Sequence, residues 1–166
     1  MKLIFLDIDG VLVTPTSHTN FLEYKEMADV MGVLPNEDAI FERDAIRNLR
    51  ELVSRTGAKV VVISQWRKTI SIGKIIKMLN DAGFLFWYKI LNTDDWFCSD
   101  AKRSREIKDF LRAVVEVNRY HEEYVIIDDS KDYEDYQLKH LVSPDPEKGF
   151  TREDMEKAIK ILEGAK

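Results

Sequence analysis

The sequence predicts an α/β fold, a three-layer α/β/α sandwich built on a mainly parallel sheet. Short apolar runs rich in β-branched residues recur along the chain, which is typical of strands buried on both faces. Segments with helical spacing of apolar residues separate these runs. Strands that alternate with helices in this way form parallel sheets through right-handed crossovers.

The predicted strands are short. The three clearest runs are Leu3 to Leu6, Lys59 to Ile63 and Tyr124 to Ile127, each dominated by Leu, Ile, Val or Phe. A fourth strand is expected over Phe84 to Leu91, and a weaker fifth over Lys139 to Val142.

The predicted helices follow from stripes of apolar residues and from their stop and start signals. Gly57 and Gly83 are expected to end the first two helices, and Thr151 is expected to cap the last one. The stripes lie at 45–53, 72–79, 107–115 and 155–162.

One segment interrupts the alternation. Residues at about 13–41 are polar, contain Pro15 and Pro35, and form a longer connection than is usual between a strand and a helix. We expect an insertion, either a flap or a minimal cap, with a short helix around Glu23 to Met31. The whole chain, 1–166, is predicted to form a single domain.

Composition limits the function. Hydrophobic residues make up 45% of the chain and charged residues 33%, as in ordinary globular proteins. The net charge of −5 argues against a general nucleic-acid coat, because such coats bind through Lys and Arg.

Asp7 and Asp9 interrupt the apolar N-terminal run before it could act as a signal peptide, and no apolar run is long enough for a membrane span. The single cysteine, Cys98, excludes an internal disulfide and suits a small packed side chain. We therefore expect a cytoplasmic protein.

Acidic and hydroxyl side chains follow the three clearest strands. Asp7 and Asp9 come after the first, Ser64 after the second, and Asp128 and Asp129 after the third. Ligands of parallel sheets bind in the crevice outside the carboxyl ends of the strands, so these side chains are predicted to converge. Four carboxylates in one crevice would repel each other unless a cation lay among them. All-oxygen ligands favour Mg²⁺.

The same residues point to phosphate chemistry. An aspartate such as Asp7 can attack phosphorus, and a carboxylate two residues on, Asp9, can protonate the leaving group and then activate water. Ser64 would supply a hydroxyl for the phosphoryl oxygens. Lys102 is the best-placed cation, although Arg103 and Arg105 are close enough in sequence to compete with it.

These residues resemble the four motifs of the haloacid dehalogenase (HAD) superfamily of phosphotransferases. Asp7-Ile8-Asp9-Gly10-Val11 resembles the DxDGx motif, Ser64 after its apolar strand the second motif, Lys102 the basic third motif, and Ile126-Ile127-Asp128-Asp129 the acidic fourth. The stretches "FLDIDGVL", "ISQWR", "REI", "VIIDDS", "KHLV" and "PDPEKGFT" narrow the resemblance to the small branch found in composite ("Swiss Army Knife") RNA-repair proteins.

The resemblance implies a HAD-like Rossmannoid fold with a small or absent cap, and a phosphoric monoester hydrolase. Asp7 would be the nucleophile and Asp9 the general acid and base, with Ser64 and Lys102 holding the phosphoryl group. Mg²⁺ would lie between Asp7, the backbone carbonyl of Asp9 and Asp129, with Asp128 nearby or acting through water. The candidate substrate-binding residues are Gly10, Gln65, Arg67 and Arg103.

The substrate stays open at this level. Capless superfamily members tend to act on large substrates, which makes a nucleic-acid end one candidate partner. A modest basic cluster supports this candidate, although a solvated helix face explains the cluster somewhat better; its members are Arg67, Lys68, Lys74 and Lys77. Trp66 could stack on a base or pack in the core.

A nucleotidase or small-metabolite phosphatase is the alternative enzyme. A phospho-accepting module of the response-regulator type, or a phosphate-binding protein without turnover, is the alternative of another class. The oligomeric state is not predicted.

Overall fold

The computed structural model describes residues 1–91, 102–118 and 123–164. In this part of the chain, four parallel strands form one sheet in the order β2-β1-β3-β4. Their bounds are Lys2–Leu6 for β1, Lys59–Val62 for β2, Glu123–Ile127 for β3 and Leu141–Val142 for β4. Cys98 lies outside the described residues. The predicted α/β fold with a parallel sheet is confirmed.

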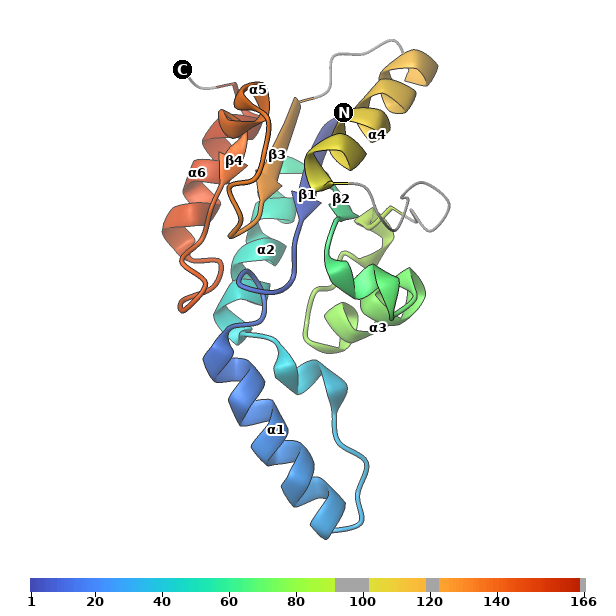
Figure 1. Ribbon diagram of the computed structural model, residues 1–166, viewed down its shortest axis with the longest axis vertical. Coiled ribbons are helices and arrows are strands. Elements are labelled where there is room, and N and C mark those ends of the chain that lie inside the picture. The colour runs from blue at the N-terminus through green and yellow to red at the C-terminus, as the bar shows by residue number, and fades with distance from the viewer. Residues whose placement is uncertain (92–101, 119–122, 165–166) are drawn as a thin grey trace.

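Helices cover both faces of the sheet (Figure 1). Because side chains alternate along a strand, Ile4 and Leu6 of β1 face one side and Leu3 and Phe5 face the other. The first pair belongs to the larger core, formed with α2, α3 and α6. The second pair packs against α4, where Phe5 meets Phe110 edge to face at 5.7 Å between ring centroids. The helix bounds are α2 Arg43–Thr56, α3 Ile72–Asp81, α4 Arg103–Asn118, α5 Asp135–Leu138 and α6 Arg152–Leu162.

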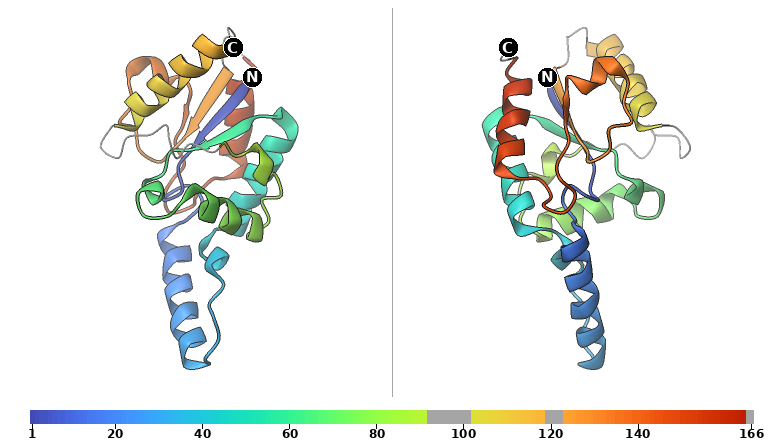
Figure 2. Two further views of the ribbon diagram at one scale, coloured as in Figure 1. Left: turned by 90° about the vertical axis from the view of Figure 1, so that its right-hand side faces the viewer. Right: turned by 60° about the vertical axis from the view of Figure 1, so that its left-hand side comes forward.

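The insertion forms an arm that projects from the body of the molecule (Figures 1 and 2). Its helix α1, Pro15–Val30, begins well before the short helix expected around Glu23 to Met31. Pro15 does not interrupt this helix because it lies in the first turn, where a missing N–H costs nothing. Thr14 caps the helix, with its Oγ1 accepting from the backbone N–H of Ser17. The arm returns through the 3₁₀ helix η1, Glu37–Ile40.

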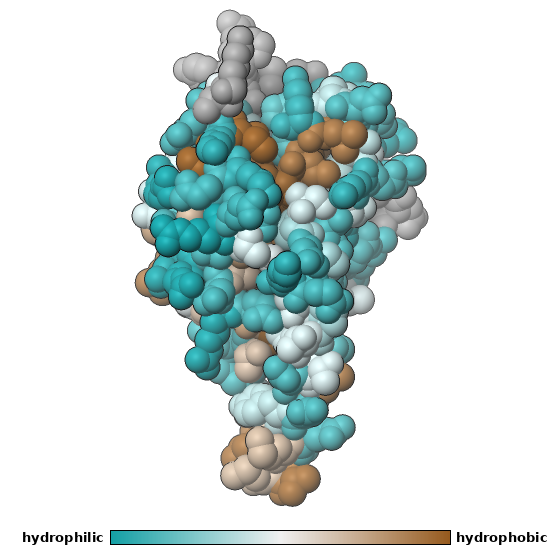
Figure 3. Space-filling model, turned by 90° about the vertical axis from the view of Figure 1, so that its left-hand side faces the viewer, coloured by the Kyte–Doolittle hydropathy of each residue, from teal (hydrophilic) through white to brown (hydrophobic). Residues whose placement is uncertain are grey.

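The base of the arm is fixed while its free end is exposed. Thr14 Oγ1 donates to Glu42 Oε1 at 2.6 Å, and the backbone N–H of Glu42 donates to the Leu12 carbonyl at 2.8 Å. Apolar side chains gather at the free end, where Val30 and Leu34 are 88% and 95% exposed (Figure 3).

The strand expected over Phe84 to Leu91 is not formed. This segment contains the 3₁₀ helix η3, Trp87–Lys89, and touches the sheet through a single bridge between Ile90 and Val60. Its aromatic rings pack on one another, and only part of the run is buried: Phe84 and Ile90 are covered, whereas Trp87 and Tyr88 are exposed. The weaker strand expected over Lys139 to Val142 is present as the two-residue β4. None of the helices in the described chain is both long enough and apolar enough to cross a membrane.

Candidate active site

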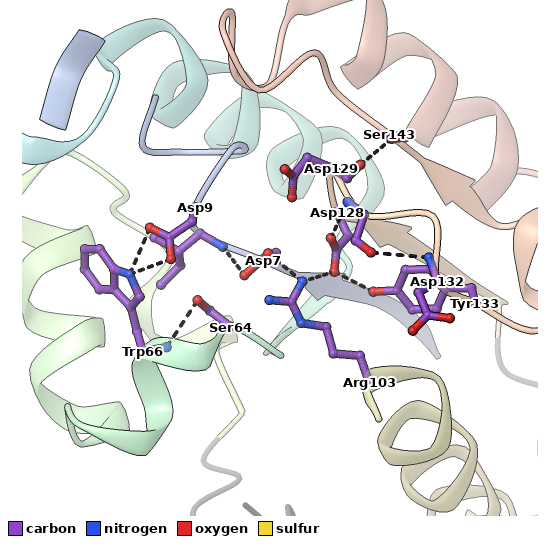
Figure 4. Close-up of polar contacts among 12 residues, drawn as sticks. Asp7, Asp9, Ser64, Trp66, Arg103, Asp128, Asp129, Asp132, Tyr133 and Ser143 are labelled. Atoms are coloured by element: carbon purple, nitrogen blue, oxygen red, sulfur yellow. Dashed lines mark hydrogen bonds and ion pairs between the residues drawn. The ribbon is translucent and has the colours of Figure 1, made fainter. Parts of the chain in front are cut away.

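The site lies at the carboxyl ends of β1, β2 and β3, where the polar residues predicted from the sequence meet (Figure 4). The sheet hydrogen bonding continues past the strands: the backbone N–H of Asp7 donates to the Ile127 carbonyl at 2.9 Å, and Ile63 donates to Leu6 at 2.8 Å. These bonds fix the backbones of the first, second and fourth motifs side by side. A cavity of about 390 Å³ opens here, with Asp7, Asp9, Gln65, Lys102, Arg103 and Asp129 among its walls.

Asp7 is almost completely buried, at 1% exposure. Its Oδ1 accepts from the backbone N–H of Ile8 at 2.8 Å, and its Oδ2 accepts from Arg103 at 2.6 Å. Burial raises the pKa of Asp7 to about 6, the Arg103 guanidinium opposes that rise, and the Asp128 carboxylate adds to it. The Ser64 hydroxyl also lowers the pKa of Asp7 and so favours its ionised form. Asp7 is therefore a buried carboxylate held by donors at both oxygens.

Arg103 is the cation that contacts the buried carboxylates. It lies at the first position of α4, and its Nη1 donates to both Asp7 Oδ2 and Asp128 Oδ2. Burial alone would lower the pKa of Arg103, but the two carboxylates outweigh it and raise that pKa. Lys102, the cation expected to hold the phosphoryl group, lies at the rim of the same cavity: it precedes the helix and is exposed, and its Nζ lies 3.7 Å from Asp132 Oδ2.

Asp128 is fully buried and its carboxylate is occupied by donors. Its Oδ1 accepts from the backbone N–H of Ser130 at 2.8 Å, and its Oδ2 accepts from Arg103 and from the hydroxyl of Tyr133. Burial and the Asp128 charge both raise the pKa of Tyr133, so this phenol remains a donor. Tyr133 was not predicted from the sequence, because a lone tyrosine beside an acidic run carries no motif signal.

Asp129 lies beside the first-motif turn. A Cβ built on Gly10, whose φ is +70°, would come within 2.6 Å of the Asp129 carboxylate, so the glycine permits both the turn and this approach. Burial raises the pKa of Asp129, and the neighbouring Asp128 charge adds to that rise. Gly10 thus shapes the site through its missing side chain.

Asp9 is exposed and contacts Trp66. The indole Nε1 of Trp66 lies 3.0 Å from each carboxylate oxygen of Asp9. The sequence indicated either base stacking or core packing for Trp66, and it gave no signal for this hydrogen bond. Trp66 belongs to the 3₁₀ helix η2, Gln65–Lys68, whose first turn is capped by the buried Ser64.

The predicted basic cluster is largely neutralised. Arg67 pairs with Glu106 at 3.1 Å, Lys74 with Glu37, and Lys77 with Asp81. Arg67 also donates through Nε to the Ser64 carbonyl at 3.3 Å, so it supports the second-motif turn. Burial raises the pKa of Glu106, an effect that Arg67 opposes. Of the predicted substrate-binding residues, Gln65 and Arg103 line the cavity, whereas Arg67 is held by its acidic partner.

Three carboxylates at the site fit a hard cation. Asp7, Asp128 and Asp129 each offer an oxygen, and these oxygens lie within 4.8 Å of one another. All-oxygen donors of this kind suit Mg²⁺ or Ca²⁺. The side chain of Asp9 is outside the group, so any contribution from Asp9 would come from its backbone. These residues could therefore bind a metal ion at the carboxyl ends of the strands.

The comparisons with known proteins agree with this geometry. A family model described as "HAD domain in Swiss Army Knife RNA repair proteins" matches residues 3–155. Searches among curated proteins and among solved structures found no significant match. HAD domains are generally hydrolases of the phosphatase type. With this match extending over nearly all of the sequence, the chain belongs to the family of HAD domains found in Swiss Army Knife RNA repair proteins.

Proposed function

We propose that this protein is a Mg²⁺-dependent phosphomonoesterase that works through an aspartyl-phosphate on Asp7. The observation that carries the proposal is the environment of Asp7, a buried carboxylate that accepts a hydrogen bond from Arg103 and lines an open polar cavity, with the Ser64 hydroxyl close enough to lower its pKa. A structural ion pair alone would not require the neighbouring carboxylates of Asp128 and Asp129 to converge on the same point.

The chemistry assigned to the chain has two steps. A carboxylate oxygen of Asp7 attacks phosphorus, the phosphorus bond to the ester oxygen breaks, and Asp9 gives its proton to the departing oxygen. Asp9 then takes a proton from water as that water attacks phosphorus, which breaks the bond to Asp7 and releases phosphate. Arg103 and Ser64 would hold the phosphoryl oxygens through both steps.

The metal would be held by the carboxylates of Asp7 and Asp129 and by the Asp9 carbonyl, with Asp128 close by. When bound, it would neutralise the carboxylates and the phosphoryl oxygens. Asp128, whose oxygens already accept from Arg103, Tyr133 and Ser130, would chiefly hold Arg103 in place.

The substrate class that we propose is a phosphorylated polynucleotide end. Two observations support it: the matched family is described by its occurrence in RNA repair proteins, and the arm contributes no described residue to the cavity wall, so a large substrate can approach. A nucleotide or small metabolite is the second candidate, favoured by the acidic partners that neutralise most of the basic cluster.

A phosphatase screen with Mg²⁺ tests both levels of the proposal. The panel would compare an aryl phosphate, nucleoside monophosphates, and oligonucleotides phosphorylated at the 3′ or the 5′ end, each with wild type and Asp7→Asn. We expect turnover by wild type, loss in Asp7→Asn, and higher kcat/KM for oligonucleotides. Equal use of mononucleotides would refute the polynucleotide assignment, and full activity of Asp7→Asn would refute the nucleophile.

The amount of phosphate that stays covalently bound to the protein distinguishes an enzyme from a phospho-accepting module. We expect wild type to release many phosphates per chain and Asp9→Asn to accumulate labelled phosphoprotein, because hydrolysis of the acyl phosphate needs the base. A single turnover by wild type, with stable label on Asp7, would instead support a signalling module.

A further inference from the structure

Trp66 holds the carboxylate that the proposed reaction uses for proton transfer. Its Nε1 is centred between the two oxygens of Asp9, at 3.0 Å from each (Figure 4). Asp9 lies on an exposed turn, and its carboxylate would otherwise be free to rotate in water. One indole N–H directed at both oxygens fixes the plane of the carboxylate and leaves outward lone pairs on each oxygen for exchange with a substrate.

The indole is itself fixed from two sides. Its ring packs against the larger core and lies at a tilt of 32° over the ring of Phe41, with 5.9 Å between centroids. Phe41 is buried and ends the insertion at the base of the arm. The Trp66 carbonyl accepts from the backbone N–H groups of Thr69 and Ile70, which closes η2 around it. The chain therefore places a rigid donor beside an exposed carboxylate.

We propose that Trp66 is a positioning residue that directs the Asp9 carboxyl group toward the leaving oxygen of the substrate. This inference rests on the proposed function and adds a residue to it. A general acid acts only within hydrogen-bonding distance of the oxygen that it protonates, and a fixed geometry removes the cost of finding that position in each turnover. Trp66 touches neither phosphorus nor the leaving group in this scheme, so its effect passes entirely through Asp9.

The test is Trp66→Phe, which removes the N–H and keeps a ring against Phe41. The substrates are substituted phenyl phosphates whose phenols differ in acidity, with kcat/KM measured for each. An acidic phenol leaves without help, whereas a weakly acidic one needs a proton from Asp9. We expect kcat/KM to fall about tenfold for the least acidic phenol, the order expected from one lost hydrogen bond to a charged group, and to change little for the most acidic.

Two controls locate the effect. In an Asp9→Asn background, adding Trp66→Phe should change no substrate selectively, because the group that the indole positions is already disabled. Trp87→Phe removes another indole, one that lies on η3 outside the cavity walls, and should leave the dependence on phenol acidity as in wild type.

A second readout does not depend on activity. In nuclear magnetic resonance spectra, the indole N–H signal that disappears in Trp66→Phe identifies Trp66, and this signal should move upfield in Asp9→Ala because its acceptor is gone. An unmoved signal would overturn the contact.

An active wild type whose dependence on phenol acidity is unchanged or weakened in Trp66→Phe would overturn the positioning role alone. A wild type that hydrolyses none of these esters, while Asp9→Ala still shifts the signal, would overturn the proposed function and the catalytic role with it.

Discussion

Arg103 Nη1 lies 2.6 Å from Asp7 Oδ2, and the same nitrogen reaches Asp128 Oδ2. One guanidinium thus joins the ends of β1 and β3 from the start of α4. A planar guanidinium presents several fixed donors, so Arg103 can bridge two carboxylates and still direct other N–H groups into the cavity. Arg103 therefore contacts the buried carboxylates directly, whereas Lys102 lies at the cavity rim.

Removing this cation should lower activity strongly. We expect Arg103→Gln to lower kcat/KM by about 10²–10³-fold, the range measured for losing one donor to a transition-state oxyanion. Lys102→Gln is the matched control, since Lys102 is exposed at the rim and its ion pair with Asp132 is long; its kcat/KM should change about twofold or less. The reverse order of these two effects would show that the cation in use is Lys102.

The sequence was sufficient for the fold class because the apolar strands and amphipathic helices carry periodic signals. It failed over Phe84 to Leu91, where an apolar and aromatic run predicted a strand. That run instead forms η3, with neighbouring rings in edge-to-face contact and a single bridge to the sheet, and apolar composition alone does not distinguish this arrangement from a strand. The long helix in the arm was underestimated for a different reason: Pro15 suggests a break, yet it is also favoured in the first turn of a helix.

The site was predictable where a residue type and its strand-end position coincide. Asp7, Ser64, Asp128 and Asp129 meet as expected because parallel strands bring their carboxyl ends together. The supporting contacts were not predictable, because the helix phase decides whether Lys102 or Arg103 faces the sheet. Trp66, Tyr133 and Glu106 likewise act through contacts that sequence spacing does not reveal.

Gly10 should not tolerate a side chain. Gly10→Ala combines a positive φ with a methyl group 2.6 Å from the Asp129 carboxylate. Gly57→Ala is the matched control, because Gly57 has a similar φ of +67° but nothing within 4 Å of its Cβ position. We expect Gly57→Ala to lower the free energy of unfolding by about 1–2 kcal/mol, the cost of holding a left-handed alanine. Gly10→Ala should lose more, and should also lose phosphatase activity. Equal stability loss with unchanged activity would refute the close approach.

Metal binding should stabilise the fold. A ligand that binds only the native state adds about 2.7 kcal/mol to the free energy of unfolding at one hundred times its Kd. We expect Mg²⁺ to raise the midpoint of thermal unfolding of wild type and to have little effect on Asp129→Asn. Asp132→Asn is the control, since Asp132 lies at the cavity rim outside the three-carboxylate group. The assignment of the three-carboxylate site is wrong if Mg²⁺ raises the unfolding midpoint of Asp129→Asn as much as that of wild type.

His140 should make stability depend on pH, independently of the active site. Its ring stacks on Tyr124 at 4.0 Å between centroids, and its Nδ1 lies 3.1 Å from the Tyr124 carbonyl. Burial lowers the pKa of His140, the Tyr124 carbonyl opposes this, and Lys139 adds to it. The folded protein therefore binds a proton less readily than the unfolded chain, whose histidines titrate near about 6.5. This stabilisation is present above that pH and is lost as the pH falls from there through the lower pKa of the folded state.

The comparison that isolates this effect is His140→Phe, which keeps a ring beside Tyr124 but cannot be protonated. Urea unfolding at a series of pH values should show the free energy of unfolding of wild type falling below about pH 6.5, with a shallower fall in His140→Phe. His18→Gln, on the exposed surface of α1, should follow wild type. If wild type and His140→Phe lose stability in parallel across this range, the acid sensitivity of the fold originates elsewhere, because the two proteins differ only in the group that takes up the proton.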